Sequence, residues 1–293
     1  MIFDFKDKIL SIFPIIPNKI AVAVSGGVDS MALLFLLKEV VPNFSEVIFP
    51  ITIDHKLRSE STSEAKEISS YLSKIFPNHT VLTSKFLKSP TANIEHIARN
   101  MRYKLLLEFC QKHQIEHLFV GHHQEDLAEN FLIRLFRGSG IDGLSATELV
   151  TNIRNIKIIR PLLDFTKDEL LGFLQEHTIT YFPDYSNDEE KYLRNKIRNF
   201  LSSLKESNLI NQRIALASRS ILESKKIIED DMVNQAKEIF NFNEIGSIAL
   251  NLENFKFLPE QKALRYLAWI LIEIGGNEYK PRLNKLGKLY QAI

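Results

Sequence analysis

The chain has 293 residues, of which 45% are hydrophobic and 25% charged, and its formal net charge is +1. This length favours two domains over one core, and the composition is that of a globular protein rather than a disordered one. The near-zero net charge excludes a positive field over the whole molecule, so any basic surface must be local. The single cysteine, Cys110, excludes an intramolecular disulfide and a metal or redox site built on a cysteine pair.

The sequence shows no membrane segment. No apolar run approaches the ~20 residues that a membrane-spanning helix needs. The first ten residues, MIFDFKDKIL, carry acidic side chains within their apolar stretch and lack the layout of a signal peptide. We therefore expect a soluble, cytoplasmic protein that makes no membrane contact.

Apolar runs and turn signals predict alternating strands and helices along the first two thirds of the chain. The valine-rich run 20–24 predicts a buried strand, and 29–40 a buried helix. Further strands are expected at 47–53, 81–87, 117–120 and 157–160. Further helices are expected at 62–76, at 93–113, at 125–136 with Gly138 and Gly140 closing it, and after Thr166, which forms a capping box with Glu169. This alternation predicts an α/β fold with a parallel sheet covered on both faces.

The last third of the chain has a different character. Residues 191–228 are expected to be mainly helical and are strongly basic, and the apolar spacing of 259–274 around Trp269 predicts another helix. We therefore predict a catalytic α/β domain over residues 1–204 and a smaller, mostly helical domain over residues 205–293.

The stretch SGGVDS between the first strand and the first buried helix predicts an anion site. The amides at a helix start have no intrahelical partner, and the helix dipole adds partial positive charge there. Gly26 and Gly27 let the backbone approach a phosphate and adopt φ values that other residues avoid. Asp29 would repel a phosphate unless a cation such as Mg²⁺ lies between them. The residues of this predicted anion site are Ser25, Gly26, Gly27, Val28, Asp29 and Ser30.

This stretch resembles the SGGxDS signature of the PP-loop ATP pyrophosphatases, and it lacks the lysine and the third glycine of the other common glycine loops. The resemblance implies a Rossmann-like fold of the adenine nucleotide alpha hydrolase type. It also implies that the six residues of the SGGVDS stretch bind ATP. The enzyme would cleave ATP between the α and β phosphates and transfer AMP to a substrate oxygen. The alternative is a strand–turn–helix corner whose glycines serve packing alone.

Five further segments narrow the resemblance to the tRNA(Ile)-lysidine synthetase family over residues 18–200. They are, in chain order, IDHKLR at 53–58, NIE at 93–95 with ARNMRY at 98–103, GHHQEDLAEN at 121–130, RGSG at 137–140, and DYSN at 184–187 with RNKIR at 194–198. The family usually carries a second aspartate, a glutamine and a threonine where this chain has Glu125, Leu127 and Asn130. The contacts of that glutamine are therefore in question.

The resemblance implies that ATP, with Mg²⁺, adenylates the 2-oxygen of the wobble cytidine in the CAU anticodon of tRNA(Ile). The ε-amine of free L-lysine then displaces AMP to form lysidine, which pairs with A rather than G. Relatives also imply a homodimer.

The resemblance assigns roles to particular residues. Asp29, Arg102 and Asp126 are the expected catalytic residues, with Asp29 also the expected Mg²⁺ ligand. His122, Asp126 and Glu129 are expected to bind lysine. On spacing alone, Arg102 fits a solvated helix face equally well, and Asp126 with Glu129 fits a pair of acids at a helix start.

A basic segment is expected to bind RNA. Arg194 and Arg198 lie four residues apart, on one side of a predicted helix, and with Lys196 they suit contacts to a phosphate backbone. The usual reading of such a run is a solvated helix face.

Three other functions stay open at this point. One is a PP-loop enzyme that thiolates RNA, which generally needs cysteine pairs or an iron–sulfur cluster. Another is a non-catalytic RNA-binding module on an ATP-binding fold. The third is an amidating ligase with a nucleophilic cysteine, for which Cys110 is a poor candidate.

Overall fold

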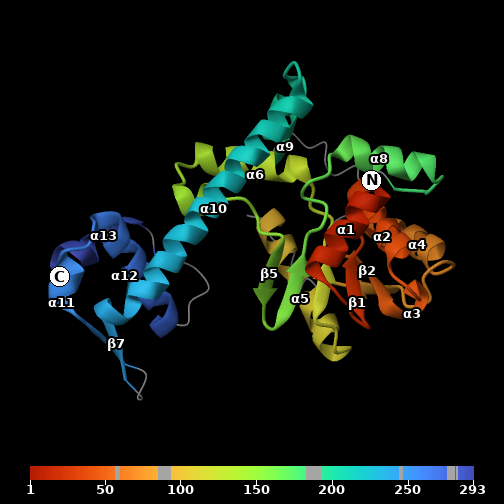
Figure 1. Cartoon of the computed structure of the whole chain (residues 1–293). Coiled ribbons are helices and arrows are strands. Elements are labelled where there is room, and N and C mark those ends of the chain that lie inside the picture. The colour runs from red at the N-terminus through yellow and green to blue at the C-terminus, as the bar shows by residue number, and fades with distance from the viewer. Residues whose placement is uncertain (57–59, 85–93, 183–192, 244–246, 276–280, 282) are drawn as a thin grey trace. The chain divides into compact units, whose positions relative to one another are not determined.

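The fold comes from a computed structural model that describes residues 1–56, 60–84, 94–182, 193–243, 247–275, 281 and 283–293 (Figure 1). Contacts divide the chain into two compact units, Met1–Ile221 and Leu222–Ile293. The division falls inside the long helix α10 (Ser207–Ile239). The predicted domain boundary at 204 and 205 lies in the short connection between α9 (Leu193–Ser203) and α10.

The first unit is built on a six-stranded sheet with the order β3-β2-β1-β4-β6-β5. The strands are β1 (Ile20–Ala23), β2 (Ile48–Asp54), β3 (Thr80–Thr83), β4 (His117–Phe119), β5 (Val150–Ile153) and β6 (Ile156–Ile159). Five of them pair in parallel, as the alternation of strands and helices predicts. In β1, for example, Ile20 pairs with Ile48 of β2, and Ala21 pairs with Leu118 of β4.

The strand β5 was not predicted, and it pairs antiparallel with β6. The two-residue turn between them has positive φ at both positions, 49° at Arg154 and 66° at Asn155. Such a turn matches the twist of a hairpin, but it usually contains glycine. Because the sequence lacks that glycine, and because β5 is short and half polar, the local sequence does not predict the hairpin.

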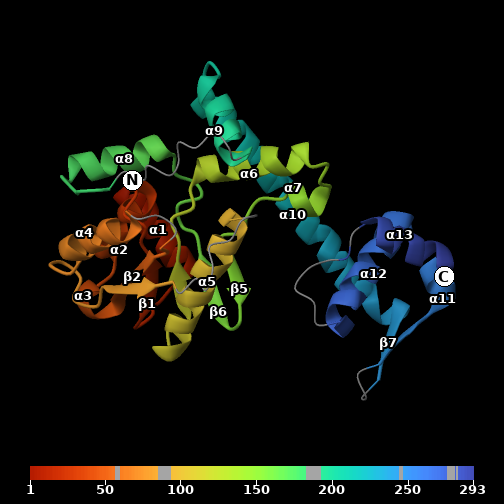
Figure 2. The ribbon, with the colours of Figure 1, turned by 180° about the vertical axis from the view of Figure 1, so that it is seen from behind.

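Helices cover both faces of the sheet (Figures 1 and 2). In chain order they are α1 (Ile2–Ile12), α2 (Val28–Val40), α3 (Phe44–Val47), α4 (Ser61–Leu72), α5 (Ile94–Lys112), α6 (Gln124–Phe136), α7 (Ile141–Leu144), α8 (Lys167–Glu176) and α9. One core cluster joins α1, α2, α4 and α8 to one face, and another joins α5 to the opposite face. Alternate residues of β1 serve the two clusters: Val22 packs with α2, and Ala21 packs with α5.

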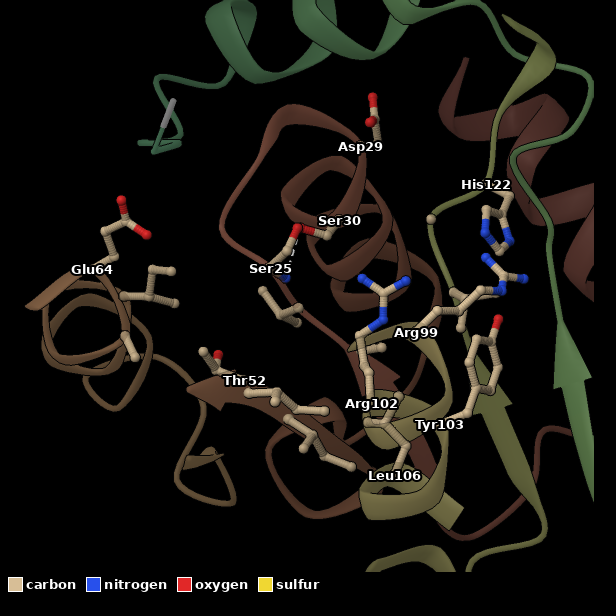
Figure 3. Close-up of a pocket in the computed structure, with 18 of the residues that line it drawn as sticks. Ser25, Asp29, Ser30, Thr52, Glu64, Arg99, Arg102, Tyr103, Leu106 and His122 are labelled. Carbon is tan, nitrogen blue, oxygen red and sulfur yellow. Dashed lines mark hydrogen bonds between the residues drawn. The ribbon is translucent and has the colours of Figure 1, made fainter. Parts of the chain in front are cut away.

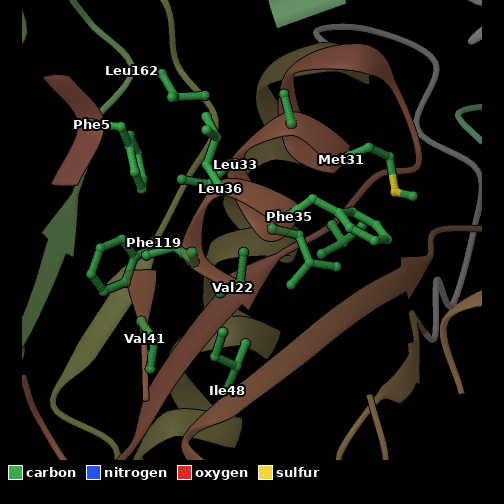
Figure 4. Packing of buried hydrophobic residues seen from close by; sticks show 14 of the residues in the cluster. Phe5, Val22, Met31, Leu33, Phe35, Leu36, Val41, Ile48, Phe119 and Leu162 are labelled. Atoms are coloured by element: carbon green, nitrogen blue, oxygen red, sulfur yellow. The ribbon is translucent and has the colours of Figure 1, made fainter. Parts of the chain in front are cut away.

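The helix α2 is the centre of the larger cluster (Figure 4). Leu33 and Leu36 are fully buried, and they pack with Phe5 of α1 and Val22 of β1. Burying such side chains stabilises the fold by about 1.5–3 kcal/mol each. The apolar composition that predicted a buried helix therefore anchors α2 rigidly, and with it the loop that precedes α2.

The start of α8 confirms the predicted capping box. The Thr166 hydroxyl accepts a hydrogen bond from the Glu169 amide at 3.2 Å, and the Glu169 carboxylate accepts one from the Thr166 amide at 2.7 Å. The signal was readable because both partners lie within four residues of the sequence.

The second unit is mostly helical. After the second half of α10 it contains the hairpin β7 (Phe240–Phe242) and β8 (Ile248–Leu250), then α11 (Leu252–Lys256), α12 (Glu260–Gly275) and α13 (Leu283–Ala292). The predicted helix around Trp269 is α12, and its Tyr266 is fully buried and donates a hydrogen bond to the Met232 carbonyl at 2.8 Å. Within the described part of the chain, no helix combines the length and apolar character needed to cross a membrane.

Candidate nucleotide and amino acid site

The SGGVDS loop joins β1 to α2, as predicted, and Gly26 sets its shape. Gly26 has φ +89°, and a Cβ atom there would lie 2.5 Å from Cδ1 of Ile68 on α4. Its carbonyl accepts a hydrogen bond from the Phe182 amide at 2.9 Å. Only glycine fits both the dihedral angle and the space.

Gly27 differs from the prediction, because it has φ −69°, which any residue can adopt. It is the N-cap of α2, and the nearest atom to a Cβ there is the Ser25 Oγ at 3.8 Å. The space before the helix start is therefore open to a ligand. The amides of Val28 and Asp29 belong to the first turn of α2, whose N–H groups have no intrahelical acceptor.

The two serines of the loop have different roles. The Ser30 hydroxyl accepts a hydrogen bond from the Ser25 amide at 3.1 Å and donates one to the Gly27 carbonyl at 3.1 Å. It therefore holds the loop closed upon itself. Ser25 is exposed, lines the cavity described next, and keeps its hydroxyl 3.2 Å from that of Ser30.

A cavity of about 350 Å³ opens at the carboxyl ends of β1, β2 and β4 (Figure 3). Its apolar floor includes Ile51, Ile53 and Leu106, and its polar wall includes Ser25, Asp29 and Asp126 among others. This is where parallel α/β sheets bind ligands. An apolar floor beside a loop of free amides suits a nucleotide, with the base on the floor and the phosphates at the loop.

Gly121, at the end of β4, was not among the predicted site residues. A Cβ there would lie 3.0 Å from the Asp29 carbonyl and 3.1 Å from the Ser30 nitrogen. Glycine thus lets the strand end pass against the backbone of α2. A glycine directly after a predicted strand is the sequence signal for such an approach.

Arg102 lies on α5, and its guanidinium points toward Ser25 across the cavity (Figure 3). Shielding from solvent lowers the pKa of Arg102, and the charges of Arg99 and Arg194 lower it further. Several arginines therefore share the cavity, which favours a polyanionic ligand. The prediction placed Arg102 here but missed Arg99, which lies one helical turn earlier on α5.

Asp29 lines the cavity at the start of α2. Its Oδ1 atom is buried and has no hydrogen-bond partner among the described residues. Burial raises the pKa of Asp29, and the negative charge of Asp126 raises it further, while His123 opposes the shift. An unpaired carboxylate oxygen beside a phosphate-binding loop is a suitable ligand for a divalent cation.

His123 lies between three carboxylates, a position that the sequence reading did not assign. Its Nδ1 is 3.0 Å from Asp126 and 3.8 Å from Asp29, and its Nε2 is 3.5 Å from Glu125. Burial works to lower the pKa of His123, but the three carboxylates outweigh it and raise the pKa to about 9. The imidazole is therefore charged at neutral pH and links α2 to α6.

The neighbouring His122 has the opposite character. Burial lowers the pKa of His122 to about 3, and the nearby arginines add to the shift, so the ring is neutral. Its Nδ1 is buried and has no hydrogen-bond partner in the described ranges. The predicted ligand role of His122 is compatible with this free atom, which belongs to a cavity-lining residue.

Asp126 and Glu129 lie on one face of α6, as their spacing predicts, but they contact arginines of α9. Arg194 donates to Asp126 at 2.9 Å and to Glu129 at 2.7 Å, and Arg198 donates to Glu129 at 2.6 Å. Burial works to raise the pKa of Asp126, but the charges of His123 and Arg194 hold it well below its usual range. A cationic ligand at these carboxylates would have to compete with the arginines.

The three predicted RNA-binding residues therefore lie on different sides of α9. Arg194 and Arg198 face the cavity and are engaged with α6, while Lys196 is exposed on another side of α9. Their role in RNA binding stays a prediction. Three of the segments that carried the resemblance fall wholly or partly outside the described residues: 57–58, 93, and 184–187 with Lys191 of the basic run.

Comparisons with known proteins agree with this geometry. A family model described as a PP-loop domain matches residues 3–204. The tRNA(Ile)-lysidine synthase of Wolbachia pipientis wMel is 35% identical over 277 residues, which cover 94% of this chain and 64% of the relative. That of the Wolbachia of Brugia malayi is 32% identical, over 99% of this chain and 67% of the relative.

A solved structure shows the same fold. It is the U34-tRNA thiolase NcsA from Methanococcus maripaludis, with a TM-score of 0.59, 18% identity, and coverage of 76% of this chain and 80% of that one. The chain spans slightly less than two thirds of the length of the first curated relative. The glycine loop, the strand-end cavity and these matches together establish that the chain belongs to the PP-loop domain family and, within it, to the tRNA(Ile)-lysidine synthases.

Proposed function

We propose that this chain ligates free L-lysine to carbon 2 of the wobble cytidine in the CAU anticodon of tRNA(Ile), with ATP as the activating substrate. The observation that carries the proposal is a cavity where an anion-binding loop, several arginines and the acidic start of α6 meet. ATP-dependent addition of an amine needs all three: sites for phosphate, for developing negative charge and for a cationic amine.

The first half-reaction is adenylation of the cytidine oxygen. The amides at the start of α2 and the Arg102 guanidinium would bind the triphosphate and neutralise the charge that develops as pyrophosphate leaves. The free Oδ1 of Asp29 would hold a Mg²⁺ ion, and such an ion would supply positive charge beside the phosphates. The proposal thus gives Asp29 and Arg102 the roles that the family resemblance implies.

The second half-reaction needs a lysine amine without its proton. Asp126 and Glu129 would hold the ammonium group by displacing the α9 arginines from part of their contacts. Asp126 stays ionised because the pKa of Asp126 is held low, so it favours electrostatic binding over proton transfer. Asp29, whose pKa burial raises, would take the ammonium proton only while it holds no Mg²⁺ ion, since a bound cation would lower that pKa.

The displaced arginines offer a link to RNA. Arg194 and Arg198, once released from α6, could contact RNA phosphates together with the exposed Lys196. The homodimer and the cytoplasmic location stay predictions of the family resemblance. Thiolation is not supported, since the only cysteine, Cys110, is buried and burial raises the pKa of its thiol to about 12.

The test is incubation of the full chain with ATP, Mg²⁺, radiolabelled lysine and an unmodified tRNA(Ile) transcript. We expect lysine to enter the RNA, with one AMP and one pyrophosphate released per lysine, and no incorporation into a transcript whose anticodon is GAU. Arg102→Gln should lower kcat/KM about 100-fold or more and leave the melting temperature unchanged. The control Lys104→Gln, on the same helix, should leave both kcat/KM and the melting temperature unchanged. Absence of lysine from the RNA with the wild-type chain would refute the proposal.

A further inference from the structure

One buried side chain, His123, lies where the starts of α2, α6 and α8 come together. It is 5% exposed and is not among the residues that line the cavity. Its ring lies beside Asp29 in the first turn of α2 and beside Glu125 and Asp126 in the first turn of α6. The roles assigned above use Asp29 and Asp126, but they give no function to His123 or Glu125.

Among the described residues, Asp29 has little besides His123 to hold its side chain in place. The Oδ1 atom of Asp29 is buried without a hydrogen-bond partner, and its Oδ2 atom lies 3.8 Å from Nδ1 of His123. Asp29 stands at the start of α2, close to Ser30 of the glycine loop (Figure 3). A carboxylate with one anchor depends on that anchor for its orientation, and a ligand that is poorly oriented binds a cation less tightly.

Asp126 differs from Asp29, because two other contacts hold it. Its Oδ2 atom accepts a hydrogen bond from the backbone amide of His123 at 3.1 Å, and its Oδ1 atom accepts one from Arg194 at 2.9 Å. Neither contact uses the imidazole ring. Loss of the ring should therefore disturb the orientation of Asp29 more than that of Asp126.

The position of His123 is itself fixed from the side of α8. Its Nε2 atom lies 3.5 Å from Glu125, whose two carboxylate oxygens accept from the Lys167 amide at 3.1 and 3.2 Å. The Gln124 amide also donates to the Phe165 carbonyl at 3.0 Å, so the start of α6 is tied to the segment before α8. These contacts leave Nδ1 of His123 on the side that faces α2.

The Nδ1 atom of His123 serves two carboxylates at once. It lies 3.0 Å from Asp126 and 3.8 Å from Asp29, and it makes a well-directed hydrogen bond to neither. A buried cation attracts nearby carboxylates without needing a directed hydrogen bond, and burial strengthens the attraction. The imidazole is therefore placed to hold the Oδ2 side of Asp29 while Oδ1 stays free.

We propose that His123 is a positioning residue for adenylation, which holds the Asp29 carboxylate so that its free Oδ1 can bind the cation that accompanies ATP, with Glu125 fixing the ring. This inference rests on the proposed function, and in particular on the role of Asp29 toward Mg²⁺. His123 acts through Asp29 and touches neither the nucleotide nor the RNA.

The test is metal-dependent binding of ATP to the full chain, which needs no turnover. Calorimetric titration of His123→Ala should give a Kd for ATP with Mg²⁺ about 10- to 100-fold above that of wild type, the usual effect of losing a residue that orients a metal ligand. The Kd for ATP in EDTA should not change. The control His177→Ala removes an exposed histidine at the end of α8 and should change neither Kd.

A second variant covers the case in which His123→Ala does not fold. His123→Asn keeps an N–H donor near the position of Nδ1, so it should restore at least part of the affinity for ATP with Mg²⁺. Circular dichroism of each variant reports whether it is folded. An affinity of folded His123→Asn no better than that of folded His123→Ala, or a wild-type affinity that is the same in Mg²⁺ and in EDTA, would overturn the inference.

A double-mutant cycle separates positioning from a general structural role. If His123 acts through Asp29, then His123→Ala should not raise the Kd for ATP with Mg²⁺ any further in the Asp29→Asn background. Equal weakening in both backgrounds would overturn the inference. In turnover, His123→Ala should slow pyrophosphate release and leave the KM for lysine nearly unchanged, because Asp126 keeps its other contacts; a raised KM with normal pyrophosphate release would show that the ring serves Asp126 instead.

Failure of this inference can be told apart from failure of the proposed function. If the wild-type chain transfers lysine to the transcript and His123→Ala binds ATP with Mg²⁺ as wild type does, only the positioning role is wrong. If the variants lose metal-dependent ATP binding as expected but the wild-type chain transfers no lysine, the proposed function fails and the positioning of Asp29 stands.

Discussion

Glu129 is the buried carboxylate of α6 that contacts both Arg194 and Arg198 of α9, so Glu129→Gln is the most direct perturbation of this contact. The Glu129 side chain is 3% exposed and accepts hydrogen bonds from Arg194 at 2.7 Å and from Arg198 at 2.6 and 3.3 Å. Removing one partner of a buried ion pair costs about 3–5 kcal/mol. Glutamine keeps one acceptor oxygen, and the guanidinium groups can rehydrate. We therefore expect Glu129→Gln to lower the free energy of unfolding by about 2–3 kcal/mol.

A loss of this size should be visible calorimetrically. For a unit of 221 residues, each kcal/mol lowers the melting temperature by about 2–4 °C, which gives about 4–12 °C in total. Trp269 is the single tryptophan and lies in the second unit, so its fluorescence follows that unit separately. The matched control is Glu108→Gln, whose carboxylate is exposed and 3.9 Å from Lys104, with an expected effect below about 0.5 kcal/mol.

The double variant sharpens this prediction. Because Glu129 and Arg198 act through the same contact, Glu129→Gln combined with Arg198→Gln should cost less than the sum of the single changes. The reasoning would be refuted by a melting temperature of Glu129→Gln equal to that of the control, or by full additivity in the double variant.

Three further predictions concern single positions. Gly26→Ala should lower the free energy of unfolding by about 1–3 kcal/mol, through strain at φ +89° and contact with Ile68. It should also weaken ATP binding at least about 10-fold in a titration. The control Gly140→Ala, in open space at φ −83°, should change neither stability nor ATP binding. Burial works to raise the pKa of Asp54, but its hydrogen bonds lower it, so its stabilising effect exists above about pH 4 and is lost as pH falls through the folded value. In urea unfolding, the advantage of wild type over Asp54→Asn should therefore shrink from pH 6 to pH 2, and a constant difference would contradict this sign. Because burial raises the pKa of Cys110 to about 12, iodoacetamide at pH 8 should label the native thiol little and the unfolded thiol fully; rapid native labelling would contradict its burial.

Several features of the fold could be read from the sequence because their causes are local. The strand, glycine loop and helix from Ile20 to Val40 depend on apolar runs and on one glycine, and the box at Thr166 and Glu169 depends on partners three residues apart. The hairpin of β5 and β6 was missed because Arg154 and Asn155 form its turn without the usual glycine. The family resemblance named ATP and tRNA(Ile), which no local pattern could supply.

The composition of the site, by contrast, was decided by the tertiary structure. The sequence placed acids on α6 and arginines on α9, but their pairing joins positions 68 and 69 residues apart and exists only because the two helices pack together. Likewise, Arg160 meets Tyr103 because β6 lies beside β4 in the sheet, where α5 covers the same face. Sequence spacing fixes which face of one helix a side chain occupies, whereas the order of strands fixes which distant side chains share a cavity, and this order depends on the burial of all the elements at once.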